Sequence, residues 1–190
     1  IRIAQNENPY GASPRVLNAI RENINTVSHY PALVLDELKE KLAQKFSVLS
    51  SQITIGPGST SLIDQLIFIR VKPDENIIVP EISFIAYKLC AEIHDRECRQ
   101  AEMMKYHINL GNILKLCDSK TRLIFLANPN NPTGTIFTHA EIIDFLNKIP
   151  EEIYVVLDEA YIEYVTDKNF PDSFEIFNRY KNVIIFRSFS

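Results

Sequence analysis

Short apolar runs rich in β-branched residues alternate with amphipathic segments from Gln52 onward. The runs predict strands at 53–55, 77–79, 98–103, 123–127, 154–157 and 183–186. Apolar residues at helical spacing predict helices between them, at 60–71, 84–93, 109–117, 138–148 and 173–180. Such alternation is typical of a mainly parallel sheet with helices on both faces, so we expect an α/β fold.

The first fifty residues have a different pattern. Ser13 followed by Pro14 predicts the start of a helix, in which Leu17, Ile20 and Ile24 recur at helical spacing. After a break at Tyr30-Pro31, a second amphipathic helix is predicted from the apolar positions Leu35, Leu38, Leu42 and Phe46. The pattern therefore predicts a helical N-terminal segment ahead of the α/β region.

Composition and charge argue against several classes of protein. A chain of 190 residues with 46% hydrophobic content can bury one substantial core. The net charge is −4 and the basic residues are scattered, so we expect no nucleic-acid partner. No apolar run approaches the roughly 20 residues that span a bilayer, and the first residues lack the apolar segment of a signal peptide. We expect no membrane partner and a cytoplasmic location.

Cysteines and histidines indicate neither disulfides nor a metal site. Cys90, Cys98 and Cys117 are odd in number and far apart, as expected of reduced core residues. The four histidines show no spacing typical of zinc ligands. We expect no bound metal.

Polar and small residues stand where the predicted strands end. They form the segments 56–60, 83–84, 128–134, 158–161 and 188–190. Because the carboxyl ends of parallel strands meet at one edge of a sheet, where helix N-termini also present free amides, ligands bind at that edge. The sequence therefore predicts a ligand site there.

The segment Asn128–Gly134 is the most distinctive of these. Proline after Asn128 and after Asn131 disfavours helical geometry at both asparagines, and Gly134 allows the chain to reverse. A tight surface turn is the ordinary interpretation of such a segment. Its position directly after an apolar run favours a loop that holds a ligand.

Two further features suggest an anion and a cation in that ligand. Gly58, Ser59 and Thr60 open a helix and suit a phosphate, although the third glycine of the dinucleotide fingerprint and the lysine of the P-loop are absent. Asp158 ends an apolar run, where its ionisation is costly unless it meets a cation. At an effective dielectric constant near 20, such a pair 4 Å apart gains about 4 kcal/mol. The alternative for Asp158 is a helix cap or an exposed acid.

Three motifs, in this order and spacing, resemble the pyridoxal-phosphate-dependent aminotransferases of fold type I. They are Asn131-Pro132-Thr133-Gly134, Asp158-Glu159-Ala160-Tyr161 and Arg187-Ser188-Phe189-Ser190. The segment 6–11, Ser13-Pro14, Tyr30-Pro31 and the segment 158–163 are similar to the histidinol-phosphate aminotransferases in particular. The resemblance covers essentially all 190 residues and implies the truncated large domain of such an enzyme.

The resemblance implies a pyridoxal 5'-phosphate cofactor and roles for individual residues. Asp158 would pair with the protonated pyridine nitrogen, and Asn131 and Tyr161 would hydrogen-bond the phenolate oxygen; these three are the expected catalytic residues. Phe84 would stack on the ring. The residues expected at the phosphate are Gly58, Ser59, Thr60, Ser188, Ser190 and, from the partner subunit of a homodimer, Tyr30.

It also implies an organisation of the chain. Residues 1–30 would form an N-terminal arm and helix on the substrate and dimer side, with Tyr10 lining the substrate pocket, and residues 31–190 the cofactor-binding domain. The lysine that forms the Schiff base with the cofactor is expected immediately after Ser190. A small C-terminal domain is expected further downstream.

The implied reaction is transamination of histidinol phosphate with 2-oxoglutarate, a step of histidine biosynthesis. Another fold type I enzyme, such as a threonine-phosphate decarboxylase or an aromatic aminotransferase, is an alternative. A non-catalytic cofactor-sensing domain of a regulator and a generic sugar- or nucleotide-binding domain are further alternatives.

Overall fold

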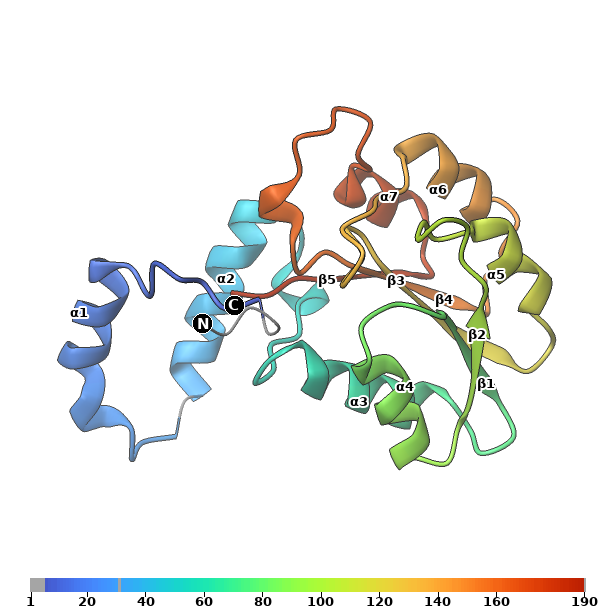
Figure 1. Cartoon of the computed structure of the whole chain (residues 1–190). Coiled ribbons are helices and arrows are strands. Elements are labelled where there is room, and N and C mark those ends of the chain that lie inside the picture. The colour runs from blue at the N-terminus through green and yellow to red at the C-terminus, as the bar shows by residue number, and fades with distance from the viewer. Residues whose placement is uncertain (1–5, 31, 190) are drawn as a thin grey trace. The chain divides into compact units, whose positions relative to one another are not determined.

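The computed structural model describes residues 6–30 and 32–189 (Figure 1). The chain divides into two compact units, Ile1–Thr54 and Ile55–Ser190. The expected functional division between residues 30 and 31 stays a prediction.

The first unit contains both predicted helices. They are α1 (Pro14–Asn23) and α2 (Ala32–Phe46), accompanied by the short 3-10 helices η1 (Ile24–Thr26) and η2 (Ser50–Gln52). Ser13 caps α1, because its Oγ accepts a hydrogen bond from the backbone N–H of Val16 at 3.3 Å and Pro14 occupies the first helical position.

The second unit contains a five-stranded parallel sheet. Its strands are β1 (Asn76–Pro80), β2 (Glu97–Ala101), β3 (Thr121–Ala127), β4 (Tyr154–Asp158) and β5 (Val183–Phe186), in the spatial order β2-β1-β3-β4-β5. Every neighbouring pair is parallel. The predicted α/β fold is confirmed.

Helices cover both faces of the sheet (Figure 1). One face packs against α3 (Ser59–Arg70) and α4 (Ala86–Ile93), and the other against α5 (Leu110–Leu116), α6 (His139–Leu146) and α7 (Ser173–Arg179). The short helix η3 (Ile162–Tyr164) follows β4. All five predicted helices are present within about two residues of their expected ends, a difference typical of helix boundaries.

The central strands are buried on both sides, which explains their unbroken apolar runs. Along β3, Leu123 and Phe125 pack towards α3 and α4, whereas Ile124 and Leu126 pack towards α5 and α6. All four side chains are fully buried. Because successive side chains of a strand point to opposite faces, each central strand contributes to two hydrophobic cores.

The predicted strand at 53–55 is wrong. Ile53 has extended backbone angles, but residues 53–55 pair with no other strand in the described part of the chain. The run is only three residues long, and η2 ends directly before it while Gly56 and Pro57 follow. It joins the two units instead of entering the sheet.

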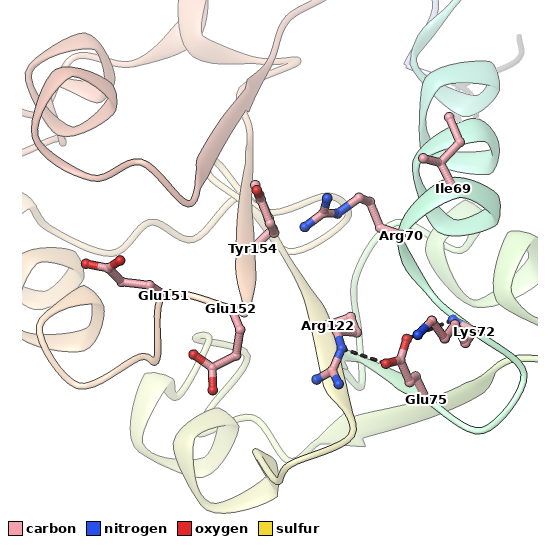
Figure 2. Close-up of a pocket in the computed structure, with 8 residues that line it drawn as sticks. All are labelled: Ile69, Arg70, Lys72, Glu75, Arg122, Glu151, Glu152 and Tyr154. Carbon is pink, nitrogen blue, oxygen red and sulfur yellow. Dashed lines mark hydrogen bonds and ion pairs between the residues drawn. The ribbon is translucent and has the colours of Figure 1, made fainter.

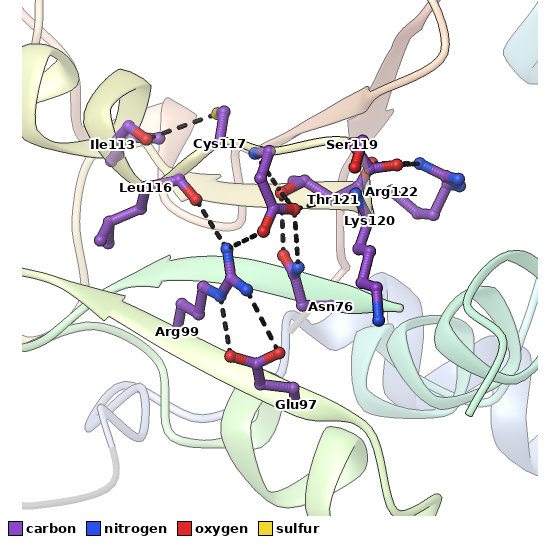
Figure 3. A network of polar contacts seen from close by, with 11 residues as sticks. Asn76, Glu97, Arg99, Ile113, Leu116, Cys117, Ser119, Lys120, Thr121 and Arg122 are labelled. Carbon is purple, nitrogen blue, oxygen red and sulfur yellow. Dashed lines mark hydrogen bonds and ion pairs between the residues drawn. The ribbon is translucent and has the colours of Figure 1, made fainter. Parts of the chain in front are cut away.

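A polar network fastens the amino ends of the central strands (Figure 3). The fully buried side chains of Asn76 and Thr121 hydrogen-bond each other at 2.9 Å, and Asn76 also donates to Asp118 at 3.1 Å. Arg99 donates to Asp118 at 2.7 Å and holds the pKa of that carboxyl well below its usual range. These groups satisfy one another, so the network serves to hold the strands together.

Among the described residues, no helix is long and apolar enough to cross a membrane. Cys90, Cys98 and Cys117 are all free thiols, and Cys90 is buried.

Candidate functional site

The segments that follow β1, β3, β4 and β5 lie together at the carboxyl edge of the sheet. We call this edge the rim and define it by residues 81–87, 128–137, 158–161 and 187–189. Backbone hydrogen bonds fix its centre: Asn128 N–H donates to the carbonyl of Asp158 at 2.9 Å, and Glu159 N–H donates to that of Phe186 at 2.9 Å. The sheet thus brings together the polar segments that the sequence placed after its strands.

Asp158 is the last residue of β4 and is only 4% exposed. Its Oδ2 accepts a hydrogen bond from the Tyr87 hydroxyl at 2.6 Å, and its Oδ1 accepts one from the backbone N–H of Ala160 at 3.2 Å. Burial raises the pKa of Asp158, while these two hydrogen bonds act in the opposite direction. No described cationic side chain forms an ion pair with it. A ligand that brings a positive charge would therefore stabilise the ionised form.

Tyr87 is a site residue that the sequence analysis missed. Its side chain is fully buried, its ring stacks on Phe125 with centroids 4.8 Å apart, and the ring of Phe84 meets it edge-on at 5.6 Å. Phe84 and Asp158, both predicted site residues, are therefore linked through Tyr87. Burial and the nearby Asp158 raise the pKa of Tyr87, with a smaller contribution from Tyr161, so the phenol stays protonated and remains a donor.

Asn130 fixes the turn after β3, although the prediction singled out its neighbour. The side chain of Asn130 is 2% exposed; it accepts a hydrogen bond from Ser83 Oγ at 2.8 Å and donates to the Ile82 carbonyl at 2.9 Å. It also donates to Thr133 Oγ1 at 2.8 Å. These contacts join the loop after β3 to the loop after β1, which carries Phe84.

Asn131 differs from Asn130 in having no such role. It is half-buried, and its side chain makes no hydrogen bond to another residue in the ranges 6–30 and 32–189. Gly134 has a φ of +69° and donates its N–H to the carbonyl of Asn130 at 2.7 Å, which is the predicted chain reversal. The amide of Asn131 is thus held on a fixed turn and is available to a ligand.

We expect alanine substitution to lower stability at Asn130 and to weaken ligand binding at Asn131. Asn130→Ala removes three hydrogen bonds and leaves half-buried partners unsatisfied, so it should lower the free energy of unfolding by about 2 kcal/mol. Asn131→Ala should leave unfolding within about 0.5 kcal/mol of the parent and weaken ligand binding instead. Urea unfolding and ligand titration of both variants test this, and equal loss of stability in both would contradict it.

A buried ion pair at the rim was also missed. Glu159 is 2% exposed and accepts from Arg187 Nη2 at 2.7 Å, from Arg187 Nε at 2.9 Å and from Ser173 Oγ at 3.0 Å. Burial raises the pKa of Glu159, and Arg187 opposes that shift. The Arg187 guanidinium also lies 5.3 Å from the centre of the Phe174 ring. The pair fixes the chain directly after β5, at the residue before Ser188, which is half-buried.

The start of α3 combines a glycine N-cap with the unpaired amides of a helix start. Gly58 is its N-cap with a φ of +90°, a conformation that favours glycine, and open space surrounds the position that a Cβ would take. Ser59 is half-buried and Thr60 is exposed. The first amides of a helix lack partners within the helix and lie at its positive end. The predicted phosphate role of these residues stays a prediction.

Three further predicted residues lie neither at the rim nor at the start of α3. Ser190 lies outside the described residues. Tyr10 and Tyr30 belong to the first unit, where their side chains are 94% and 98% exposed. Their roles stay predictions.

A surface pocket at the amino end of the sheet is a different feature (Figure 2). Charged residues of both signs line it. Among them Arg122 forms an ion pair with Glu75 at 2.7 Å, and Arg70 lies 4.1 Å from the centre of the Tyr154 ring. The pocket shares no residue with the rim. It is therefore not the predicted site.

Comparisons with known proteins find relatives and solved structures that match the whole chain. The histidinol-phosphate aminotransferase of Anaeromyxobacter sp. (strain Fw109-5) is 41% identical over 190 residues, which cover 100% of this chain and 52% of the relative. The crystal structure of histidinol-phosphate aminotransferase from Sinorhizobium meliloti in complex with pyridoxal-5'-phosphate superposes with a TM-score of 0.90 at 26% identity, over 98% of this chain and 51% of that one.

The histidinol-phosphate aminotransferase from Clostridium acetobutylicum has a TM-score of 0.82 at 25% identity, over 98% of this chain and 55% of that one. The chain thus spans about half the length of these relatives. The family model for aminotransferase class I and II matches residues 1–190. With the parallel sheet and the motifs at its rim, this match shows that the chain belongs to the class I and II aminotransferases.

Proposed function

We propose that the full-length protein is a pyridoxal 5'-phosphate-dependent aminotransferase that transfers the amino group of histidinol phosphate to 2-oxoglutarate, as a step of histidine biosynthesis. The observation that carries the proposal is the buried Asp158 carboxylate at the rim, which has no cationic partner among the described residues. The names of the relatives support the substrate.

The residues at the rim fit this cofactor. When bound, the cofactor supplies a cationic ring that withdraws electrons from the substrate's α-carbon. Asp158 would hold the proton on the ring nitrogen, because a carboxylate in a buried site favours a positive neighbour. Asn131 and Tyr161 would hydrogen-bond the phenolate oxygen, and Phe84 would cover one face of the ring. Each role needs a side chain that the rim carries.

The phosphate would lie at the start of α3. Gly58 allows close approach, and Ser59, Thr60 and Ser188 would donate hydrogen bonds to its oxygens. Ser190 would contribute in the same way. We further propose a homodimer in the cytoplasm, with Tyr30 of the partner subunit at the phosphate, and we assign Tyr10 to the substrate pocket. In this division residues 1–30 serve substrate and dimer contacts, and residues 31–190 bind the cofactor.

An assay of the full-length protein tests the proposed reaction. With pyridoxal 5'-phosphate, histidinol phosphate and 2-oxoglutarate, we expect glutamate to form at a rate well above that with phenylalanine or threonine phosphate. If phenylalanine is turned over and histidinol phosphate is not, the proposed substrate is wrong and the enzyme acts on an aromatic amino acid. If carbon dioxide is released from threonine phosphate, the proposed transamination is wrong and the enzyme is a decarboxylase.

A further inference from the structure

Tyr87 donates a hydrogen bond to one of the two carboxylate oxygens of Asp158, and this contact bears on how Asp158 would hold the cofactor. Its hydroxyl donates to Oδ2 at 2.6 Å, a distance typical of a hydrogen bond between a hydroxyl and a charged oxygen. The weaker contact, from the backbone N–H of Ala160 at 3.2 Å, is to Oδ1. The carboxylate is therefore held in one orientation, with a short hydrogen bond to Oδ2 and a longer one to Oδ1.

The surroundings of Tyr87 make this donor rigid. The ring is fully buried between Phe125, on which it stacks, and Phe84, which meets it edge-on. It comes from α4, whereas Asp158 ends β4, and 71 positions separate them in the chain. A phenol fixed in this way keeps its hydroxyl on Oδ2 without loss of side-chain entropy at the moment of ligand binding.

We propose that Tyr87 is a positioning residue that keeps the Asp158 carboxylate ionised and oriented towards the pyridine nitrogen of the bound cofactor. The inference rests on the proposed function. The acid and the ring nitrogen share one proton, which can reside on either. A donor on Oδ2 stabilises the carboxylate more strongly than the neutral acid, so it favours the proton on the nitrogen.

The other titratable groups near Asp158 do not replace this donor. Glu159 follows it in the chain, but its carboxylate is engaged by Arg187 and Ser173. Tyr161, three residues after Asp158 in the chain, also belongs to the rim and is assigned to the phenolate side of the cofactor. Tyr87 makes the only side-chain hydrogen bond to Asp158 within the described residues.

Nitrogen-15 NMR of the full-length holoenzyme, loaded with cofactor labelled at the pyridine nitrogen, tests the proposal. In the parent protein the chemical shift should report a protonated nitrogen at pH 7. Tyr87→Phe keeps the ring contacts and removes only the hydroxyl. It should move the proton equilibrium towards the unprotonated nitrogen by about tenfold, with a matching fall in kcat and little change in KM.

Two controls make the result specific. Tyr180→Phe removes an exposed hydroxyl that donates to Asn147 at 2.7 Å, and it should leave the nitrogen shift and kcat unchanged. If Tyr87→Phe fails to fold, 3-fluorotyrosine at position 87, a stronger donor, should raise the pH at which the ring nitrogen loses its proton in a pH titration of the nitrogen shift. An unchanged nitrogen shift in Tyr87→Phe, or an unchanged pH of deprotonation in the 3-fluorotyrosine variant, overturns the role of Tyr87. An unprotonated nitrogen in the parent, or no bound cofactor, overturns the proposed function itself.

Discussion

Asp158→Asn is expected to lower kcat of the full-length protein about a thousandfold. A charge pair 4 Å apart at an effective dielectric constant near 20 is worth about 4 kcal/mol, and each 1.36 kcal/mol in a barrier is tenfold in rate. Asparagine has the same shape, and its single amide oxygen can still accept one of the two hydrogen bonds that Asp158 receives from Tyr87 and from the Ala160 backbone, so the fold should remain intact. Steady-state kinetics with histidinol phosphate and 2-oxoglutarate measures the effect.

Asp144→Asn is the matched control for this prediction. Asp144 lies on α6 with its side chain 69% exposed, where it pairs with Lys148 one helical turn away. The same chemical change there should leave kcat within about twofold of the parent, because exposed pairs contribute little. A loss of less than tenfold in Asp158→Asn, with cofactor bound, would contradict the assigned role of Asp158.

Arg187→Ala is expected to lower the free energy of unfolding by about 3 kcal/mol at pH 7. Removal of one partner of a buried ion pair leaves the other charge uncompensated, and Glu159 is 2% exposed. The estimate is at the lower end of the range for such pairs because the Arg187 side chain is 29% exposed. Urea unfolding of the full-length protein measures the loss.

The loss should depend on pH in a defined direction. Burial raises the pKa of Glu159, and removal of Arg187 raises it further. Below the unfolded-state pKa of about 4.3 the carboxyl is protonated in both states, so the charge contributes little to the difference between variant and parent. The unfolded-state term is common to both proteins, so the difference should grow as the pH rises above the raised pKa of Glu159 in the folded parent towards 7. Lys148→Ala, which breaks the exposed pair on α6, should cost only about 0.3–0.5 kcal/mol. A loss as small for Arg187→Ala would contradict the buried-pair interpretation.

Much of the fold could be predicted because the central strands are buried on both faces. Residues 123–127 form an unbroken apolar run for this reason, and the polar groups that follow them mark the rim. Asp158 was recognisable because a carboxylate at the end of such a run needs a partner. The strand predicted at 53–55 was wrong, because three apolar residues in a row do not show whether a neighbouring strand exists to pair with them.

The residues that support the site could not be predicted in this way. Tyr87 reads as an ordinary core residue of a helix, and its partner Asp158 lies 71 positions away. Asn130 and Ser83 are 47 positions apart, and Glu159 and Arg187 are 28 apart. These contacts arise from the order of the strands in the sheet, which local pattern does not encode. The spacing of Tyr87, three residues after Phe84, was the one local signal for its proximity to the site.

We expect Asp158 to meet the ring nitrogen of pyridoxal 5'-phosphate at the rim. A crystal structure of the full-length protein with the cofactor bound would show this contact. We predict an Asp158 oxygen about 2.7–2.9 Å from the pyridine nitrogen, with Tyr87 on the other oxygen and the phosphate at the first amides of α3. A cofactor whose ring nitrogen faces any other group, with Asp158 bound only to Tyr87 and the protein backbone, would contradict the claim.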